Sequence, residues 1–425
     1  MALIDNLKWS SIGVVFRYIL QILSIVILTR WLNPEDFGLL ASILIVTSIV
    51  TVLAQGGAVQ IIGTSNDDTI KINFITCAIL SIFISTIMIF ILFVFKFEIT
   101  KFLHVSDVDI YLVLISTIIF RSSSSFLEGL SVYYGYFKEQ AKIETASYFI
   151  GYFITSVSLV YLGFGIYGIA IGTAIQPIIS VCLYQRMLSP KIKLIVKDSQ
   201  IKPMVVFKRA KYIIVSQLAS NFISQVDNLI VNKYFGLKDL GFYTRSYQMM
   251  VIPCNFFGQV INKVFLNYFS NSNLGNSNLI RKSIILSFFF SIFVKLFLLL
   301  FGNYLVTLLF GSDWLPITSL IIVLSASIFP RLIYKVAEPI LISSGNEKHL
   351  TIYVVTYAVS LLFFIFTFMS DNVMSIALSI SLSTWLYSLL CFRKVVEIHK
   401  IRCLKIYLIV ILSMLSDLCI FIKFY

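Results

Sequence analysis

Long apolar blocks recur along the whole chain, separated by short polar turns. A bilayer core about 30 Å thick is crossed by a helix of roughly 20 apolar residues, which is about the length of these blocks. The composition agrees, because 59% of the residues are hydrophobic and 12% are charged, and a soluble domain carries roughly twice that charge. No alternating pattern of the outer-membrane barrel kind dominates. The sequence therefore predicts an all-α polytopic membrane protein.

The blocks predict about twelve core spans in two bundles of six helices, followed by one further segment. The first six spans are placed at 11–29, 37–58, 72–95, 110–130, 146–162 and 167–188. The second six are placed at 212–235, 242–266, 283–300, 317–343, 350–369 and 373–392. The segment 404–422 could cross the membrane or lie on its surface. The predicted domains are an N-terminal six-helix lobe (1–188), a basic cytoplasmic linker (189–211), a C-terminal six-helix lobe (212–394) and a basic segment with the extra helix (395–425).

The formal net charge of +13 is concentrated in loops. The loop after the sixth predicted span and the segment after the twelfth are the most basic, and both fall on the same side of the membrane as the N-terminus. Cytoplasmic loops carry an excess of Lys and Arg, so we expect a cytoplasmic N-terminus. No aromatic-plus-basic motif points to nucleic acid. The six cysteines are scattered and form no CxxC pair, so neither a metal site nor a cofactor is expected.

A short pattern occurs once in each half of the chain. The first copy is WLNPEDFGLL at 31–40 and the second is FGLKDLGFY at 235–243. Each places an Asp, a large apolar residue and a Gly at the entry to the next span. An Asp can cap a helix start, and a Gly permits close helix approach. The matching positions favour a duplication, with two bundles related by a pseudo-two-fold axis along the membrane normal.

Charged residues inside the predicted spans are candidates for a transport site, because such charges are costly and usually face a bundle interior or a watery cavity. The predicted substrate-binding cations are Arg17, Arg121, Arg245, Arg331 and Lys335. The candidate ion-coupling acids are Glu128, Asp227 and Glu338. Residues 331, 335 and 338 share one helix face, where an internal ion pair is the alternative interpretation. Lys295 is a weaker candidate.

A polar stripe follows one face of the seventh predicted span. Besides Ser224 it contains Gln217, Asn221, Gln225, Asn228 and Asn232. Polar side chains can hold transmembrane helices together, and that alternative accounts for one or two of them. The length of the stripe favours a water-lined path.

Three ordered motifs resemble the polysaccharide exporters of the Wzx/WzxC type, within the multidrug/oligosaccharidyl-lipid/polysaccharide (MOP) exporter superfamily. They are Gln21 with LTRWLNPEDFG at 28–38, GFGIYG at 163–168, and QVDN at 225–228 followed by LGFY at 240–243. The resemblance implies a MATE-like, two-lobed transporter of the bacterial cytoplasmic membrane. Its cargo would be polyprenyl-pyrophosphate-linked oligosaccharide for O-antigen, capsule or exopolysaccharide, moved by alternating access and coupled to ions. Other polysaccharide-assembly proteins would be its partners.

The charges agree with that cargo, because Arg stays charged and pairs bidentately with phosphate. Two alternatives stay open. An ion-coupled small-molecule or drug antiporter on the same fold would favour acids in its cavity, and a membrane polymerase of the same pathway would need a long outer loop. The sequence has no GxxxxGK[ST] loop for ATP and no catalytic constellation. We therefore expect a transporter and not an enzyme.

Overall fold

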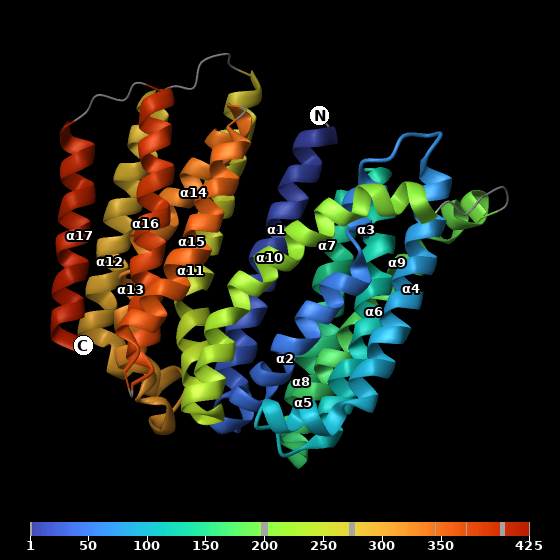
Figure 1. Ribbon diagram of the computed structural model, residues 1–425, viewed down its shortest axis with the longest axis horizontal. Coiled ribbons are helices and arrows are strands. Elements are labelled where there is room, and N and C mark those ends of the chain that lie inside the picture. The colour runs from blue at the N-terminus through green and yellow to red at the C-terminus, as the bar shows by residue number, and fades with distance from the viewer. Residues whose placement is uncertain are drawn as a thin grey trace. The chain divides into compact units, whose positions relative to one another are not determined.

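The computed structural model describes residues 2–196, 203–271, 277–344, 346–370, 372–399 and 404–424. Within these ranges every regular element is a helix and none is a strand, which confirms the all-α prediction. The chain divides into two compact units, Met1–Gly241 and Phe242–Tyr425. Figure 1 shows the helices of both.

Unit 1 holds the first twelve helical elements and the first turn of the next one. They are α1 Ala2–Leu28, α2 Pro34–Gln55, α3 Ala58–Gly63, α4 Ile70–Val94, α5 Lys96–Phe102, α6 Val108–Tyr133, α7 Phe137–Ala146, the π-helix η1 Ser147–Ile154, α8 Thr155–Leu159, the π-helix η2 Val160–Phe164, α9 Ile166–Val196 and α10 Pro203–Phe235. A buried cluster that includes Ile62, Leu130 and Leu188 joins α3, α6 and α9.

Unit 2 contains the remaining helices, although the first five residues of α11, 237–241, belong to unit 1. They are α11 Leu237–Asn271, α12 Ser277–Leu309, the 3₁₀ turn η3 Ser312–Trp314, α13 Ile317–Ser325, α14 Ile328–Ser343, α15 Glu347–Phe368, α16 Met374–Ile398 and α17 Leu404–Phe424. Its core joins α12, α14 and α16 around Phe329, Trp385 and Cys391.

Most of the predicted spans correspond to long apolar helices. Among the described residues, eight helices are long and apolar enough to cross a membrane, or nine if one bent pair counts as a span. Large side chains such as Phe90, Phe293 and Phe366 stand exposed on their surfaces, which is favourable in lipid and not in water. Helices α10 and α11 are long but more polar and are not among the eight. The chain is therefore a multi-pass membrane protein.

The tenth predicted span is broken, although the apolar pattern predicts one helix over 317–343. Its two halves, α13 and α14, meet at 46°. Pro330 stands in the first turn of α14 and has no N–H for the carbonyl of Ala326. The backbone turns there through i→i+3 bonds from Ala326 to Val323 and from Ser327 to Leu324. The break follows from this missing donor.

The predicted lobes are only partly reflected in the compact units. Helix α10, the first of the predicted C-terminal lobe, packs along α2 inside unit 1. The predicted linker 189–211 contains the end of α9 and the start of α10, and its residues 197–202 lie outside the described ranges. Residues 400–403 of the predicted C-terminal segment lie outside them too. The six-helix lobes stay a prediction.

The two copies of the short sequence pattern contact each other. A Cβ on Gly38 would lie 1.7 Å from the carbonyl oxygen of Leu237, and a Cβ on Gly241 would lie 1.8 Å from that of Pro34. The contacts are reciprocal, as a local two-fold relation between the copies would produce. Asp36 accepts the backbone N–H of Asn33 at 3.1 Å, so this Asp fixes the start of α2 as predicted.

We expect Gly38→Ala and Gly241→Ala each to destabilise the protein by about 1–3 kcal/mol or more, because the methyl group would enter backbone atoms of the facing turn. The melting temperature of detergent-purified protein measures this. Gly302→Ala is the matched control, since its Cβ would meet only the methyl group of Thr318, at 3.0 Å. Equal melting temperatures for all three variants would show that the contact tolerates separation.

Candidate functional site

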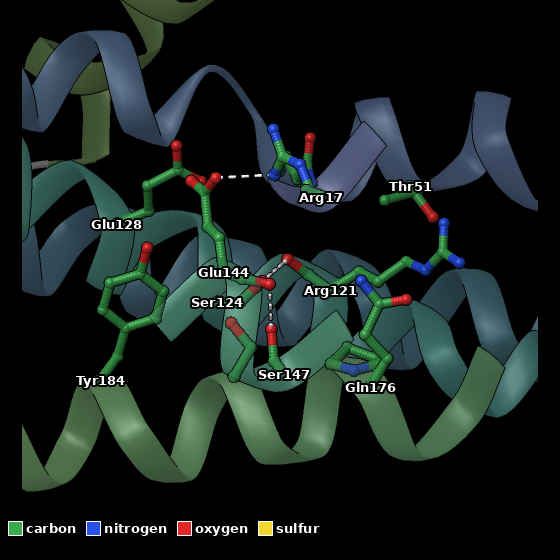
Figure 2. A pocket seen from close by; sticks show the side chains of 12 residues that line it. Arg17, Thr51, Arg121, Ser124, Glu128, Glu144, Ser147, Gln176 and Tyr184 are labelled. Atoms are coloured by element: carbon green, nitrogen blue, oxygen red, sulfur yellow. Dashed lines mark hydrogen bonds and ion pairs between the residues drawn. The ribbon is translucent and has the colours of Figure 1, made fainter. Parts of the chain in front are cut away.

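A cavity of about 360 Å³ lies within unit 1, between α1, α2, α6, α7, η1 and α9. All but one of its lining residues carry polar side chains. They are Arg17, Thr51, Gln55, Arg121, Ser124, Glu128, Glu144, Ser147, Gln176, Pro177, Ser180 and Tyr184. Figure 2 shows the side chains converging from several helices on one space. The structure thus brings together three predicted residues, at positions 17, 121 and 128.

Helix periodicity explains how the walls form. Residues 121, 124 and 128 of α6 recur at three- and four-residue spacing and share one face, as do residues 176, 180 and 184 of α9. Small residues let the facing helices approach, since a Cβ on Gly151 would lie 2.5 Å from the Cα of Gln176. Gly151 and Ser147 belong to the π-helix η1, and π-helical turns occur often at functional sites.

One end of the cavity holds an ion pair and a second carboxylate. Arg17 Nη1 donates to Glu144 Oε2 at 2.7 Å, and both side chains are about one-third exposed, at 34% and 30%. Gln140 Nε2 donates to Glu144 Oε1 and to Glu128 Oε1, both at 3.1 Å. The amide therefore holds the two carboxylates as one network beside the arginine.

Arg121 differs from Arg17. Its guanidinium makes no ion pair or hydrogen bond with any residue that the structure describes. Its side chain extends toward the end of the cavity where Thr51 and Gln176 lie (Figure 2). The hydroxyl of Tyr184, 2% exposed, also lacks a partner among the described atoms. These donors are free to bind a ligand that carries acceptor oxygens.

Glu128 and Glu144 oppose the two arginines, so the formal charges of this cavity balance. The sequence predicted a cation-rich cavity with Glu128 as a coupling acid. Among the described residues, Arg17 is paired and Arg121 has no ion-pair partner. No carboxylate of the described residues pairs with Arg121, so anion binding there stays a prediction.

The other predicted cations lie in unit 2. Arg331 is buried, donates through Nε to Ser327 Oγ at 3.2 Å and through Nη2 to the Tyr247 hydroxyl at 3.1 Å, and stacks over the Tyr247 ring. Arg245 donates to Gln248 Oε1 at 2.6 Å. These contacts fix both guanidinium groups on their own unit. Whether either binds substrate stays a prediction.

The α14 face was also interpreted as an internal ion pair, which stays an alternative. Among the described residues, Lys335 and Glu338 form no ion pair. Glu338 Oε1 instead accepts the Tyr387 hydroxyl at 2.8 Å. The stem of Lys335 lies where a Cβ on Gly258 would be, at 2.5 Å from Lys335 Cδ. A glycine on α11 therefore makes room for this lysine.

The polar stripe holds helices together at two positions. Asn232 Nδ2 donates to Ser42 Oγ at 2.9 Å and to the Leu103 carbonyl at 3.1 Å, and Asn221 Oδ1 accepts Ser48 Oγ at 3.2 Å. Both contacts attach α10 to other elements of unit 1.

Asn228, in the same stripe, makes contacts within α10. Asn228 Nδ2 donates to Gln225 Oε1 at 3.0 Å, and its backbone N–H donates to the buried Asp227 at 2.8 Å. The side-chain amide oxygen of Gln217, Oε1, is buried and has no hydrogen-bond partner among the described residues. The water-lined path along the stripe stays a prediction.

Sequence reasoning missed Glu144, Gln140 and Tyr184. The fifth span was predicted to begin at residue 146, because the charges before it suggested a loop. The helix begins at Phe137, so the residues before 146 belong to the wall. The spacing of residues 140 and 144 on one helix face was the available signal.

Comparisons with known proteins agree with this architecture. The family model described as "Polysaccharide biosynthesis protein" matches residues 27–319. No curated protein sequence matches the chain. Among solved structures, the lipid II flippase MurJ in an inward closed conformation superimposes with a TM-score of 0.76 at 16% identity, over 98% of this chain and 93% of that chain.

Two structures of multidrug resistance MATE family transporters of the MOP superfamily, in different conformations, are also similar. The inward-facing one gives a TM-score of 0.67 at 14% identity, over 90% of this chain and 95% of that chain. The outward-facing one gives 0.62 at 14% identity, over 93% and 96%. These identities establish the fold alone, and they confirm the predicted MATE-like class. Because the family model covers well over half of the sequence, the chain belongs to the polysaccharide biosynthesis protein family.

Proposed function

We propose that this protein moves polyprenyl-pyrophosphate-linked oligosaccharide units from the inner to the outer leaflet of a bacterial cytoplasmic membrane. The units would be precursors of O-antigen, capsule or exopolysaccharide, as for a Wzx-type flippase. Membership of the polysaccharide biosynthesis protein family and a flippase-like, MATE-like fold support a transporter of lipid-linked material. Other polysaccharide-assembly proteins would hand over and receive the cargo.

The guanidinium of Arg121, which has no partner among the described residues, lies in a polar membrane cavity, and this observation carries the proposal. A diphosphate is the part of the cargo that must lose water when it enters the membrane. Arginine recognises phosphate oxygens with two parallel hydrogen bonds. Ser124 and Gln176 offer further polar groups beside it, which suit phosphate or sugar oxygens.

Ion coupling is part of the proposal, and Glu128 is its candidate in the cavity. Its carboxylate is held only by Gln140 among the described residues. In-membrane carboxylates commonly serve as proton or cation relays. Asp227 and Glu338 are the other candidates, and each is engaged by neighbours on its own unit.

For the membrane topology, we place the N-terminus in the cytoplasm and α17 across the membrane as an additional span. Among the described side chains of α17, the exposed face is mostly apolar and includes Leu408, Ile411, Leu412, Leu415 and Leu418. Its one acid, Asp417, is buried and forms an ion pair with Lys295 of α12. Helix α12 lies beside α17 in Figure 1. A helix with this distribution suits lipid on one side and protein on the other.

A small-molecule or drug antiporter driven by ions is the second candidate. The two cavity carboxylates favour it, because cationic drugs and coupling ions both bind acids. A polymerase activity is disfavoured by the transporter fold.

Deletion of the gene distinguishes the candidates. We expect lipid-linked repeat units to accumulate in the inner leaflet and surface polymer to disappear, with drug susceptibility unchanged. Leaflet-resolved analysis of the lipid-linked units measures the first effect, and complementation with the intact gene is the control. Normal export together with increased drug susceptibility would refute the flippase and favour the antiporter.

A further inference from the structure

The Arg17–Glu144 ion pair lies in the wall of the unit 1 cavity and faces its interior. The two side chains are joined at 2.7 Å and each keeps about one-third of its surface exposed. Water and a ligand can therefore reach both partners. Exposed pairs of this kind are weak, so a stronger anion can replace the carboxylate.

Two hydrogen bonds fix the orientation of the Glu144 carboxylate. Gln140, one helical turn earlier, donates to its Oε1 while Arg17 donates to its Oε2. Glu144 is thus held in place from the side opposite the arginine. If the Arg17 side chain moved to another anion, the Glu144 carboxylate would stay in place and continue to attract the Arg17 guanidinium.

Arg121 offers a first contact for an incoming anion, because it has no partner among the described residues. The Tyr184 hydroxyl, also unpartnered there, is a second donor in the same wall. An anion can dock on Arg121 without breaking any contact among the described residues. Engaging Arg17 as well would require it to displace Glu144.

We infer that Glu144 is a resident anion that competes with the cargo's diphosphate for Arg17. In the empty cavity Arg17 pairs with Glu144. A diphosphate bound at Arg121 then takes Arg17 through charge-assisted hydrogen bonds, and the return of Arg17 to Glu144 promotes release. This inference rests on the proposed function and assigns Glu144 as a positioning residue that limits affinity in favour of turnover.

The physical need for such a competitor is clear. Transport requires binding that is strong enough to capture the cargo and weak enough to let it leave. A diphosphate held by two unopposed arginines in a low-dielectric cavity would dissociate slowly. A carboxylate that is already paired with one arginine lowers the net binding free energy of the diphosphate, while the diphosphate can still contact both arginines.

Glu144→Gln tests the inference, because glutamine keeps the size and the contact with Gln140 but loses the charge. Full-length protein in phosphatidylcholine nanodiscs is titrated with farnesyl pyrophosphate, a short prenyl diphosphate. We expect about fivefold tighter binding, which is the factor that an exposed ion pair of up to about 1 kcal/mol supplies. Transport at saturating cargo should slow, since release becomes harder.

Glu128→Gln is the matched control. It removes one negative charge from the same cavity, and among the described residues Glu128 forms no hydrogen bond or ion pair with Arg17. Loss of one negative charge from the cavity should therefore raise the affinity for farnesyl pyrophosphate slightly in both variants. The additional increase should appear only in Glu144→Gln. The melting temperature of each variant checks that it is folded.

The double variant Arg17→Ala/Glu144→Gln decides the outcome. If Glu144 acts through Arg17, removing its charge has almost no effect on affinity once Arg17 is absent. Equal tightening in both backgrounds would overturn the inference while leaving the anion cavity intact. A probe that binds the wild type and Arg121→Ala equally well would refute the anion cavity itself, and the competition with it.

Discussion

Replacement of Arg121 by alanine is expected to reduce export of lipid-linked oligosaccharide at least tenfold. Arg121 is the cavity cation that no described carboxylate neutralises, so it provides the strongest local attraction for a diphosphate. A hydrogen bond to a charged group contributes about 1.5–3 kcal/mol, and a tenfold change corresponds to about 1.4 kcal/mol. Loss of one such bond is enough for the expected effect.

Export is measured as lipid-linked units that reach the outer leaflet, at matched amounts of protein in the membrane. Arg121→Lys should recover part of the activity, because it restores the charge but not the bidentate fork. Lys394→Ala is the control for a lost cation, since Lys394 lies outside the cavity and pairs with Glu397 on its own helix. Full export by Arg121→Ala would show that the cargo does not use this cavity.

The helices were predictable from the sequence because membrane insertion imposes a length on every apolar block. The pattern at 31–40 and 235–243 was informative for a related reason. The starts of α2 and α11 approach so closely that a Cβ at Gly38 or Gly241 would meet backbone atoms of the facing turn. A repeated glycine at the same place in two halves therefore predicts a contact as well as a duplication.

Partners across helices were not predictable. Lys335 and Glu338 share a face of α14, yet the carboxylate binds Tyr387 from α16 and the lysine extends over Gly258. Spacing along one helix shows which residues share a face, but not which neighbouring helix supplies a better donor. The Arg17–Glu144 pair spans 127 positions and depends on how α1 packs against α7.

Helix boundaries caused the other omission. Charged residues before position 146 suggested a loop, whereas the structure continues the helix from Phe137 and turns Glu144 inward. With Glu144 included, the formal charges of the cavity lining balance, whereas the sequence predicted an excess of cations. A site predicted from in-span charges alone misses acids in the turns next to a span, where they can still reach the interior.

Asp417→Ala is expected to destabilise unit 2 by about 3–5 kcal/mol, the usual cost of removing one partner from a buried ion pair. Lys295 is 4% exposed and its ammonium binds Asp417, so the variant leaves a cation buried without its counter-charge. Trp385 Nε1 loses its acceptor as well, at 3.1 Å from Asp417 Oδ2. Thermal unfolding in detergent, together with limited proteolysis of α17, measures the loss.

The paired variant Lys295→Met/Asp417→Leu separates charge from packing. One interpretation is that each partner of the buried pair is needed only because the other is charged. In that case two apolar side chains of similar size should restore most of the stability that a single substitution of either residue removes. If the double variant is as unstable as Asp417→Ala, the hydrogen bonds to Trp385 and Lys295 hold α17 in place by themselves. A wild-type melting temperature for Asp417→Ala would mean that α17 does not depend on this contact, and the assignment of α17 as an additional span would lose its main support.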